Sequence, residues 1–180
     1  MNMKIRIAGI TEESIVDGPG LRIVVFTQGC PHKCQGCHNP DTHDVNGGYT
    51  ADIDGLYNHI QKNAVRNKLL RGVTFSGGEP FLQAGPLACL AKRLRSQGLD
   101  IVTYSGFTFE QLAAMAVERK SVGQLLKQTD ILVDGLYRET ERDLGLAFRG
   151  SRNQRLIDVP ATFAAGQVVL WEDAAQKQWA

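Results

Sequence analysis

Three of the four cysteines of the chain lie within eight positions, in the segment GCPHKCQGCHNP that runs from Gly29 to Pro40. They are Cys30, Cys34 and Cys37. The residues around them, chiefly Gly, Pro, Lys, Gln and His, are typical of a loop and not of a core. In a reducing compartment, clustered cysteines are more often metal ligands or redox groups than disulfide partners. The fold must therefore present three thiols on one compact loop.

The composition is that of a globular protein, with 43% hydrophobic and 22% charged residues in 180. This length suits one domain with its own core, and we expect a single domain over residues 1–180. A net charge of +1 provides no basic field for nucleic acid or an anionic membrane. No apolar run reaches the roughly 18 residues of a membrane span, and the N-terminal MNMKIRIAGI lacks the apolar core of a signal peptide. We therefore expect a cytoplasmic protein that binds neither nucleic acid nor membrane.

Hydrophobic periodicity predicts strands that alternate with helices. The predicted strands are residues 4–10, 21–28, 72–77, 100–106, 130–135, 154–159 and 167–171. The predicted helices are marked by apolar stripes over residues 53–64 and 87–94 and by a capping box at Thr108 and Gln111. This alternation implies a parallel sheet with crossover helices, but a closed eight-fold barrel takes ~250 residues. We expect an α/β fold in the form of a partial, open parallel β/α barrel.

Several kinds of site compete for the three cysteines. A structural zinc site takes four protein ligands, and His38 is poorly placed as the fourth because it directly follows Cys37. An electron-transfer iron–sulfur centre usually has four cysteines, and Cys89, in a predicted helix far along the chain, is a poor fourth ligand. Unliganded core cysteines do not suit this loop. A [4Fe–4S] cluster on three thiolates leaves one iron open to a small molecule, and an open metal position marks a reactive site.

A second motif, TFSGGEP, runs from Thr74 to Pro80 and includes the end of a predicted strand. Gly77 and Gly78 form either a plain turn or a stretch of backbone that a ligand approaches closely. Strand ends are where α/β folds bind ligands, and the carboxylate of Glu79 suits an ammonium group. The motif is therefore a second candidate for the functional site.

The spacing C-x3-C-x2-C together with the later GGEP resembles the radical S-adenosylmethionine (SAM) enzymes. The resemblance implies a partial barrel of the radical SAM type. It also implies that Cys30, Cys34 and Cys37 hold a [4Fe–4S] cluster whose open iron binds SAM. The reduced cluster would cleave SAM to a 5′-deoxyadenosyl radical, chemistry that the cofactor carries while the protein orients it.

Longer stretches resemble one branch of these enzymes. The segment SIVDGPGLRIVVFTQGCPHKCQGCHNP is similar to the start of the glycyl-radical-enzyme activating proteins. The later DILVDGLY and FRGSRNQRLIDV resemble the anaerobic ribonucleoside-triphosphate reductase activating proteins in particular. This resemblance implies an enzyme that installs a glycyl radical on the large reductase subunit, with electrons from a flavodoxin-type or other low-potential donor.

The resemblance also implies which residues lie near SAM. Those near the adenine are Gly36, Cys37 and His38, and those at the methionine end are Gly77, Gly78 and Glu79. Asp134, at the end of a predicted strand, either contacts SAM or forms a turn before Gly135.

Other residues keep two interpretations. Asp17, in the turn sequence DGPG, either shapes the turn or touches the substrate glycine. Arg149, Arg152 and Arg155 either form a solvated polar loop or bind the partner or SAM. Val102 stands where pyruvate formate-lyase activators carry an Asp, so the resemblance does not extend to their monovalent-cation site.

Three alternative functions stay open. The chain could activate another glycyl radical enzyme, such as pyruvate formate-lyase. It could act on a small molecule, as the 7-carboxy-7-deazaguanine synthases do. The non-catalytic alternative is an iron–sulfur electron carrier or a zinc module.

Overall fold

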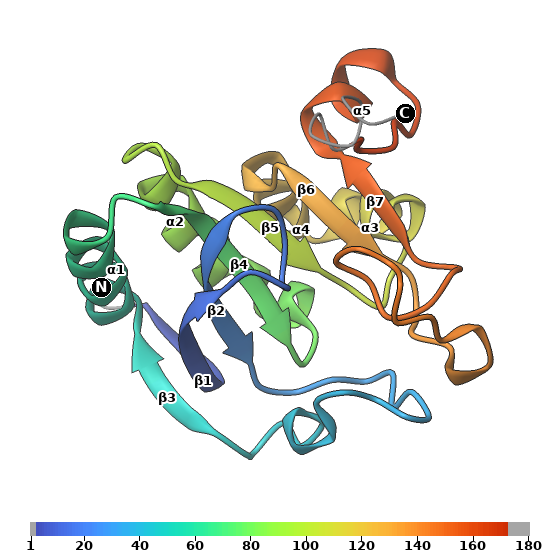
Figure 1. Ribbon diagram of the computed structural model, residues 1–180, viewed down its shortest axis with the longest axis horizontal. Helices are drawn as coiled ribbons and strands as arrows, with labels where there is room; N and C mark the ends of the chain where they lie inside the picture. The colour runs from blue at the N-terminus through green and yellow to red at the C-terminus, as the bar shows by residue number, and fades with distance from the viewer. Residues whose placement is uncertain (1–2, 173–180) are drawn as a thin grey trace.

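The computed structural model describes residues 3–172, and its strands form one open mixed sheet (Figure 1). The strands are β1 (Lys4–Ser14), β2 (Leu21–Thr27), β3 (Tyr49–Asp52), β4 (Leu70–Gly77), β5 (Asp100–Tyr104), β6 (Ile131–Asp134) and β7 (Arg155–Asp158). Their order in the sheet is β3-β1-β2-β4-β5-β6-β7. The central strands β2, β4, β5 and β6 are parallel, which confirms the predicted open α/β barrel. The outer strands β1, β3 and β7 are antiparallel to their neighbours, so the parallel arrangement does not extend to the edges of the sheet.

Helices connect the parallel strands. They are α1 (Ile53–Arg66), α2 (Ala84–Arg95), α3 (Phe109–Glu118), α4 (Lys120–Gln128) and α5 (Val159–Ala165), with short 3₁₀ turns η1 (Pro40–Thr42), η2 (Pro80–Gln83) and η3 (Glu139–Glu141). The predicted capping box at α3 is confirmed, because Thr108 and Gln111 bond reciprocally to each other's backbone. Within residues 3–172, no helix combines the length and apolar character that crossing a membrane requires.

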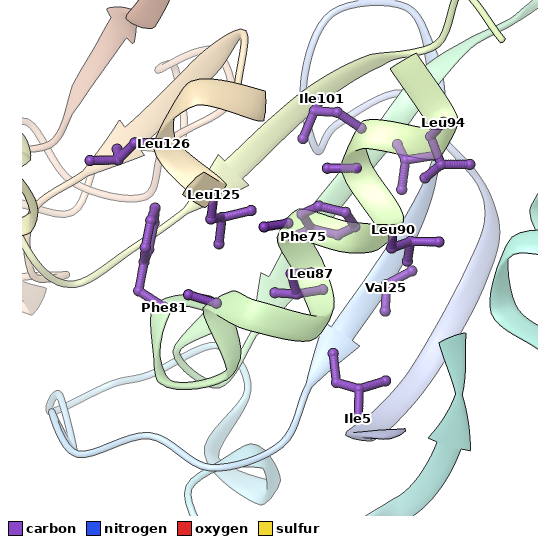
Figure 2. Close-up of a cluster of buried hydrophobic side chains, with 14 of the residues drawn as sticks. Ile5, Val25, Phe75, Phe81, Leu87, Leu90, Leu94, Ile101, Leu125 and Leu126 are labelled. Carbon is purple, nitrogen blue, oxygen red and sulfur yellow. The ribbon is translucent and has the colours of Figure 1, made fainter. Parts of the chain in front are cut away.

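One face of the sheet packs against the helices α1 to α4, and we call it the helix-covered face. Val25, Phe75 and Ile101 project from adjacent strands into this layer and are fully buried. Figure 2 shows them against the stripe of α2 that contains Leu87, Leu90 and Leu94. The stripe is buried because residues spaced by three or four positions share one side of a helix.

The opposite face is covered by loops, and we call it the loop-covered face. Side chains alternate along a strand, so the neighbours of the core residues, such as Thr74 and Ser76, point to this side. Residues 15–20 arch over it, and the Thr74 hydroxyl donates to a backbone carbonyl in that arch. Residues 143–150 cover its other part, where the Tyr104 hydroxyl donates to a backbone carbonyl at 2.6 Å. A small apolar cluster completes the face: Val102, Ile131, Val133 and Leu156.

The structure departs from the sequence prediction in four elements. The sequence did not predict β3, α4 or α5. The strand predicted over residues 167–171 is wrong, because only Leu170 forms a bridge there, with Ile157. Asp158 caps α5 directly after β7, and the chain then returns to β7 for a few backbone bonds only, at Val169 and Trp171.

Candidate functional site

The cysteine loop, residues 29–40, connects β2 to β3 across the carboxyl ends of the parallel strands. Its base is fixed by backbone bonds from Gly29 to the Thr42 carbonyl at 2.8 Å and from Cys30 to the His43 carbonyl at 3.2 Å. A tight turn brings the Cys37 amide to a carbonyl of the same loop. The loop is therefore held as a compact unit at the edge where parallel strands end.

The three thiols of this loop line one cavity of about 630 Å³. All three are free and half-buried. The same cavity is lined by the carboxyl ends of β4 and β5 and by residues from the arch 15–20 and the segment 143–150. This volume is typical of a small-molecule or cofactor site.

Burial raises the pKa of the Cys30 and Cys34 thiols, although backbone amides, those of His32 and Lys33 for Cys30, oppose the shift. Metal ligands must be thiolates, so binding a metal here releases protons. The amide of Asn39 donates to the sulfur of Cys37 at 3.4 Å, and bonds of this kind tune iron–sulfur centres. Soft thiolates on one cavity suit an iron–sulfur cluster.

The thiols line this cavity without meeting at one point. In the described part of the chain, no three His, Cys, Asp or Glu side chains converge on a position for a single metal ion. A cluster of several irons has its ligands on separate corners. The three thiols on the wall of one cavity are ligands of the kind that such a cluster takes.

The glycines of GGEP are required by the protein's own backbone. Gly77 has φ +92°, and a β-carbon there would lie 2.8 Å from the α-carbon of Phe26. A β-carbon on Gly78 would collide with the carbonyl of Gly29, the first residue of the cysteine loop. The amide of Glu79 also donates to that carbonyl at 2.8 Å. The motif thus lies directly against the cysteine loop, a contact that neither the turn nor the ligand interpretation of these glycines predicted.

The carboxylate of Glu79 is fully buried and surrounded by donors. It accepts from the amides of Phe81 at 3.0 Å and Gly106 at 2.9 Å and from the Ser105 hydroxyl at 3.0 Å. The imidazole Nε2 of His32, from the cysteine loop, lies 3.0 Å from it. Sequence reasoning did not select His32 or Ser105, since His32 and Glu79 are 47 positions apart and no local pattern links them.

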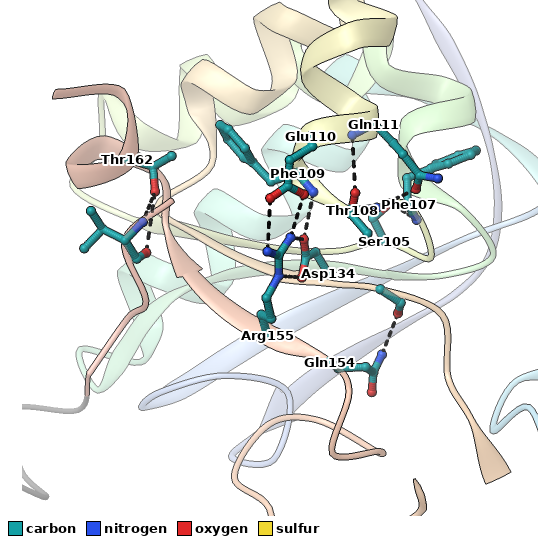
Figure 3. Close-up of polar contacts among 12 residues, drawn as sticks. Ser105, Phe107, Thr108, Phe109, Glu110, Gln111, Asp134, Gln154, Arg155 and Thr162 are labelled. Carbon is teal, nitrogen blue, oxygen red and sulfur yellow. Dashed lines mark hydrogen bonds and ion pairs between the residues drawn. The ribbon is translucent and has the colours of Figure 1, made fainter. Parts of the chain in front are cut away.

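Asp134 is buried at the end of β6 and engaged by neighbouring elements (Figure 3). Arg155 of β7 donates to both of its oxygens, at 2.9 and 2.5 Å, and the Phe109 amide at the start of α3 donates at 2.7 Å. Arg155 also reaches Glu110 at 2.8 Å and lowers the pKa of that carboxyl to about 2. Arg155 therefore links β6, β7 and α3. Asp134 and Arg155 line a second cavity of about 370 Å³, which shares His32, Gly106 and Gly135 with the first.

Of the residues predicted near the adenine, Cys37 and His38 line the larger cavity, whereas Gly36 does not. The ring of His38 is 4.9 Å from that of Tyr137 with an angle of 49° between them. Gly36 has φ +72°, and a β-carbon there would collide with the Glu139 carboxylate.

The residues with two interpretations are placed as follows. The Asp17 carboxylate accepts from the Ser14 hydroxyl at 2.5 Å and lines the larger cavity. Arg149 lines that cavity too and donates to the carbonyl of Gln154, whereas Arg152 pairs with Asp143 on the surface.

Two further positions lie away from the thiols. Cys89 is exposed on α2 and does not line the cavity. Val102 is buried in the apolar cluster of the loop-covered face, where its side chain offers no ligand for a cation.

Comparisons with known proteins agree with this geometry. Residues 16–157 match the family model of a 4Fe-4S single cluster domain. The anaerobic ribonucleoside-triphosphate reductase-activating protein of Vibrio cholerae is 33% identical over 147 residues, which cover 78% of this chain and 89% of that protein. The pyruvate formate-lyase-activating enzyme of Clostridium pasteurianum is 38% identical over 112 residues, 59% of this chain and 47% of that enzyme. The crystal structure of QueE from Escherichia coli matches with a TM-score of 0.45 and 20% identity, over 59% of this chain and 54% of QueE.

Proposed function

We propose that this chain, which belongs to the family of anaerobic ribonucleoside-triphosphate reductase-activating proteins, installs a glycyl radical on the large subunit of such a reductase. It is a radical SAM enzyme that uses a [4Fe–4S] cluster and SAM. When bound, the cluster supplies the electron that splits SAM into methionine and a 5′-deoxyadenosyl radical. That radical takes one α-hydrogen from the target glycine, which gives 5′-deoxyadenosine and leaves the unpaired electron on the glycine α-carbon.

One observation carries the proposal: the three thiols, the GGEP backbone and two covering loops line a single cavity. A cofactor and a substrate backbone can therefore meet there. The rim of the cavity is apolar and exposed, with Ile15 at 72%, Val16 at 70% and Leu144 at 84% of their surface accessible. Exposed apolar groups beside a site support a macromolecular partner.

The proposed roles follow from placement. Cys30, Cys34 and Cys37 hold the cluster, and Gly36 and His38 lie beside the adenine. The backbone of Gly77 and Gly78 lies along the methionine end of SAM. Hydrogen-atom transfer needs no acid or base, so the site requires position and exclusion of water more than titratable groups. For electrons, we propose a flavodoxin-type or other low-potential donor.

Electron paramagnetic resonance tests the function. Anaerobically reconstituted and reduced protein, mixed with SAM and the large reductase subunit, should give a glycine radical seen as a doublet from the remaining α-hydrogen. The same mixture with Cys34→Ala should give none, because the cluster has lost a ligand. Replacing the target glycine of the reductase by Ala should abolish the doublet while SAM cleavage continues. A cognate reductase that never gains the radical, or turnover of a small metabolite instead, would refute the proposal.

The pyruvate formate-lyase activator is the second candidate, supported by the similarity to the Clostridium pasteurianum enzyme. The same assay with pyruvate formate-lyase in place of the reductase separates the two. We expect the radical to form on the reductase at a far higher yield. A higher yield on pyruvate formate-lyase would show that this enzyme, and not the reductase, is the preferred substrate.

A further inference from the structure

We propose that Glu79 and His32 form a latch that positions the cysteine loop, and that the Glu79 carboxylate acts through this loop instead of binding the ammonium group of SAM. The proposal rests on the proposed function only for the identity of the group that the loop holds. The latch itself is a property of the chain without any cofactor, and it can be tested in that state.

Four donors surround the Glu79 carboxylate. They come from three segments: the Phe81 amide from η2, the Ser105 hydroxyl and Gly106 amide from the end of β5, and Nε2 of His32 from the cysteine loop. A carboxylate offers about four acceptor positions. Four donors therefore occupy the carboxylate, which has 0% of its residue surface exposed. An ammonium group would have to displace one of them.

The His32 ring packs closely against the turn that follows β5. Its edge packs on Phe107 at a centroid distance of 4.5 Å and an angle of 71°. Gly106 lies directly against the ring, and a β-carbon on Gly106 would collide with it. The turn after β5 thus packs closely around the imidazole. A chance surface contact would not require a glycine at position 106 to make room for the ring.

His32 lies in the cysteine loop between the first two thiols. It stands midway between Cys30 and Cys34, and its neighbours Pro31 and Lys33 are exposed. His32 therefore anchors the stretch that carries the first two thiols. Since the other end of the latch is the Glu79 of GGEP, the contact fixes the two motifs relative to each other.

Metal-free protein gives the test that does not depend on the cofactor. Trypsin cuts after Lys33, and the fragment 1–33 can be followed by mass spectrometry. We expect His32→Ala to release this fragment about tenfold faster, because a hydrogen bond to a buried charge holds the loop. His32→Gln, whose amide can still donate, should restore much of the protection, and His32→Leu should not. Cleavage after Lys62 in α1 reports global unfolding and should stay unchanged.

A matched control uses the exposed pair of His59 and Glu12, whose atoms lie 3.2 Å apart on the surface. His59→Ala should leave cleavage after Lys33 at the wild-type rate. An equal rate in His32→Ala and wild type would overturn the latch, whatever the outcome of the radical assay.

Reconstituted protein then separates the latch from direct SAM binding. We expect His32→Ala and Glu79→Gln each to speed chelator-driven iron release and to weaken SAM binding by similar factors. The double variant should be no worse than the worse single variant, because the contact that His32→Ala removes is among those that Glu79→Gln disturbs. If Glu79→Gln weakened SAM binding with normal iron release, and His32→Ala changed neither, Glu79 would be a direct ligand and the proposal would fail.

Discussion

The two faces of the sheet use neighbouring residues of the same strands in opposite ways. On β4, Val73 and Phe75 enter the dry core under α2, whereas Thr74 and Ser76 face the cavity and its covering loops. The helix-covered face is held by close packing of apolar side chains. Around β4 the loop-covered face is held by hydrogen bonds to buried polar groups, and a small apolar cluster joins β5, β6 and β7. The difference shows that one strand can supply a packed core from one side and a ligand-accessible site from the other.

Arg22 illustrates how polar contacts hold the part of the loop-covered face around β2 and β4. It is fully buried, and burial lowers the pKa of its guanidinium, opposed by the charge of Asp100 at 2.6 Å. It donates to the Thr74 hydroxyl at 2.8 Å and to the Pro19 carbonyl at 3.0 Å. A single cation therefore joins β2, β4, β5 and the arch over the cavity.

The largest expected effect lies on the helix-covered face. Phe75→Ala should lower the free energy of unfolding by about 3–5 kcal/mol, because it leaves a cavity in the core. Urea unfolding of the metal-free protein measures this. Ser76→Ala on the opposite face should change it by less than about 1 kcal/mol. Equal losses from both changes would remove the distinction between the faces.

Arg22→Met should have the next largest effect, about 3 kcal/mol, because it removes the ion pair with Asp100 and the buried hydrogen bonds to Thr74 and Pro19. It should also release the arch, so the yield of glycyl radical should fall more than the cleavage of SAM. Unfolding in urea and the ratio of radical to 5′-deoxyadenosine measure the two effects. A normal ratio would show that the arch does not contribute to the substrate side of the cavity.

Two glycines sharpen the comparison. Gly78→Ala should destabilise the protein by about 1–3 kcal/mol and impair cluster retention, since the new methyl group strikes the Gly29 carbonyl. Gly85→Ala in α2 should instead stabilise by about 0.5–1 kcal/mol, because its nearest neighbour, Ser121, is 3.8 Å away. Thermal unfolding and iron content measure both. A stable, cluster-loaded Gly78→Ala protein would contradict the close approach.

The smallest effect is a pH dependence. The pKa of Glu110 is lowered to about 2 by its hydrogen bonds with Arg155, so the pair stabilises the fold above pH about 4.5. This contribution should be lost as the pH falls from about 4.5 towards 2. The pair is largely exposed, so we expect less than about 1 kcal/mol. Wild type and Glu110→Gln should therefore differ more in urea unfolding at pH 6 than at pH 3, and a constant difference would contradict this role.

Apolar periodicity made α2 predictable, whereas α4 was missed although its buried residues Val122, Leu125 and Leu126 also follow a helical spacing. The spacing of Leu87, Leu90 and Leu94 predicts α2 because residues three or four positions apart lie on the same, buried side of a helix. In β3 the pattern is weak because Tyr49 and Thr50 are exposed on an edge strand. The direction of an edge strand depends on the path of the loop that connects it to the sheet. The hydrophobic pattern within the strand holds no information about that path.

The site was predictable in its motifs but not in its contacts. The spacing of the cysteines placed three thiols on one loop, and the structure gives them one cavity. The contact between His32 and Glu79 joins segments brought together only by the order of strands in the sheet. No local signal distinguishes such a histidine from a solvated one.

Residues 169–171 lie along the outer side of the edge strand β7 and bond to its backbone. The Asp158 amide donates to the Val169 carbonyl, and the Trp171 amide donates to the Leu156 carbonyl, both at 2.9 Å. These bonds occupy donors and acceptors on the outer side of an edge strand, where free groups would template pairing with another chain. A chain shortened before residue 169 would expose them, and strand addition between copies would become a route to aggregation. Residues 169–171 thus protect the β7 edge of the sheet from pairing with another molecule.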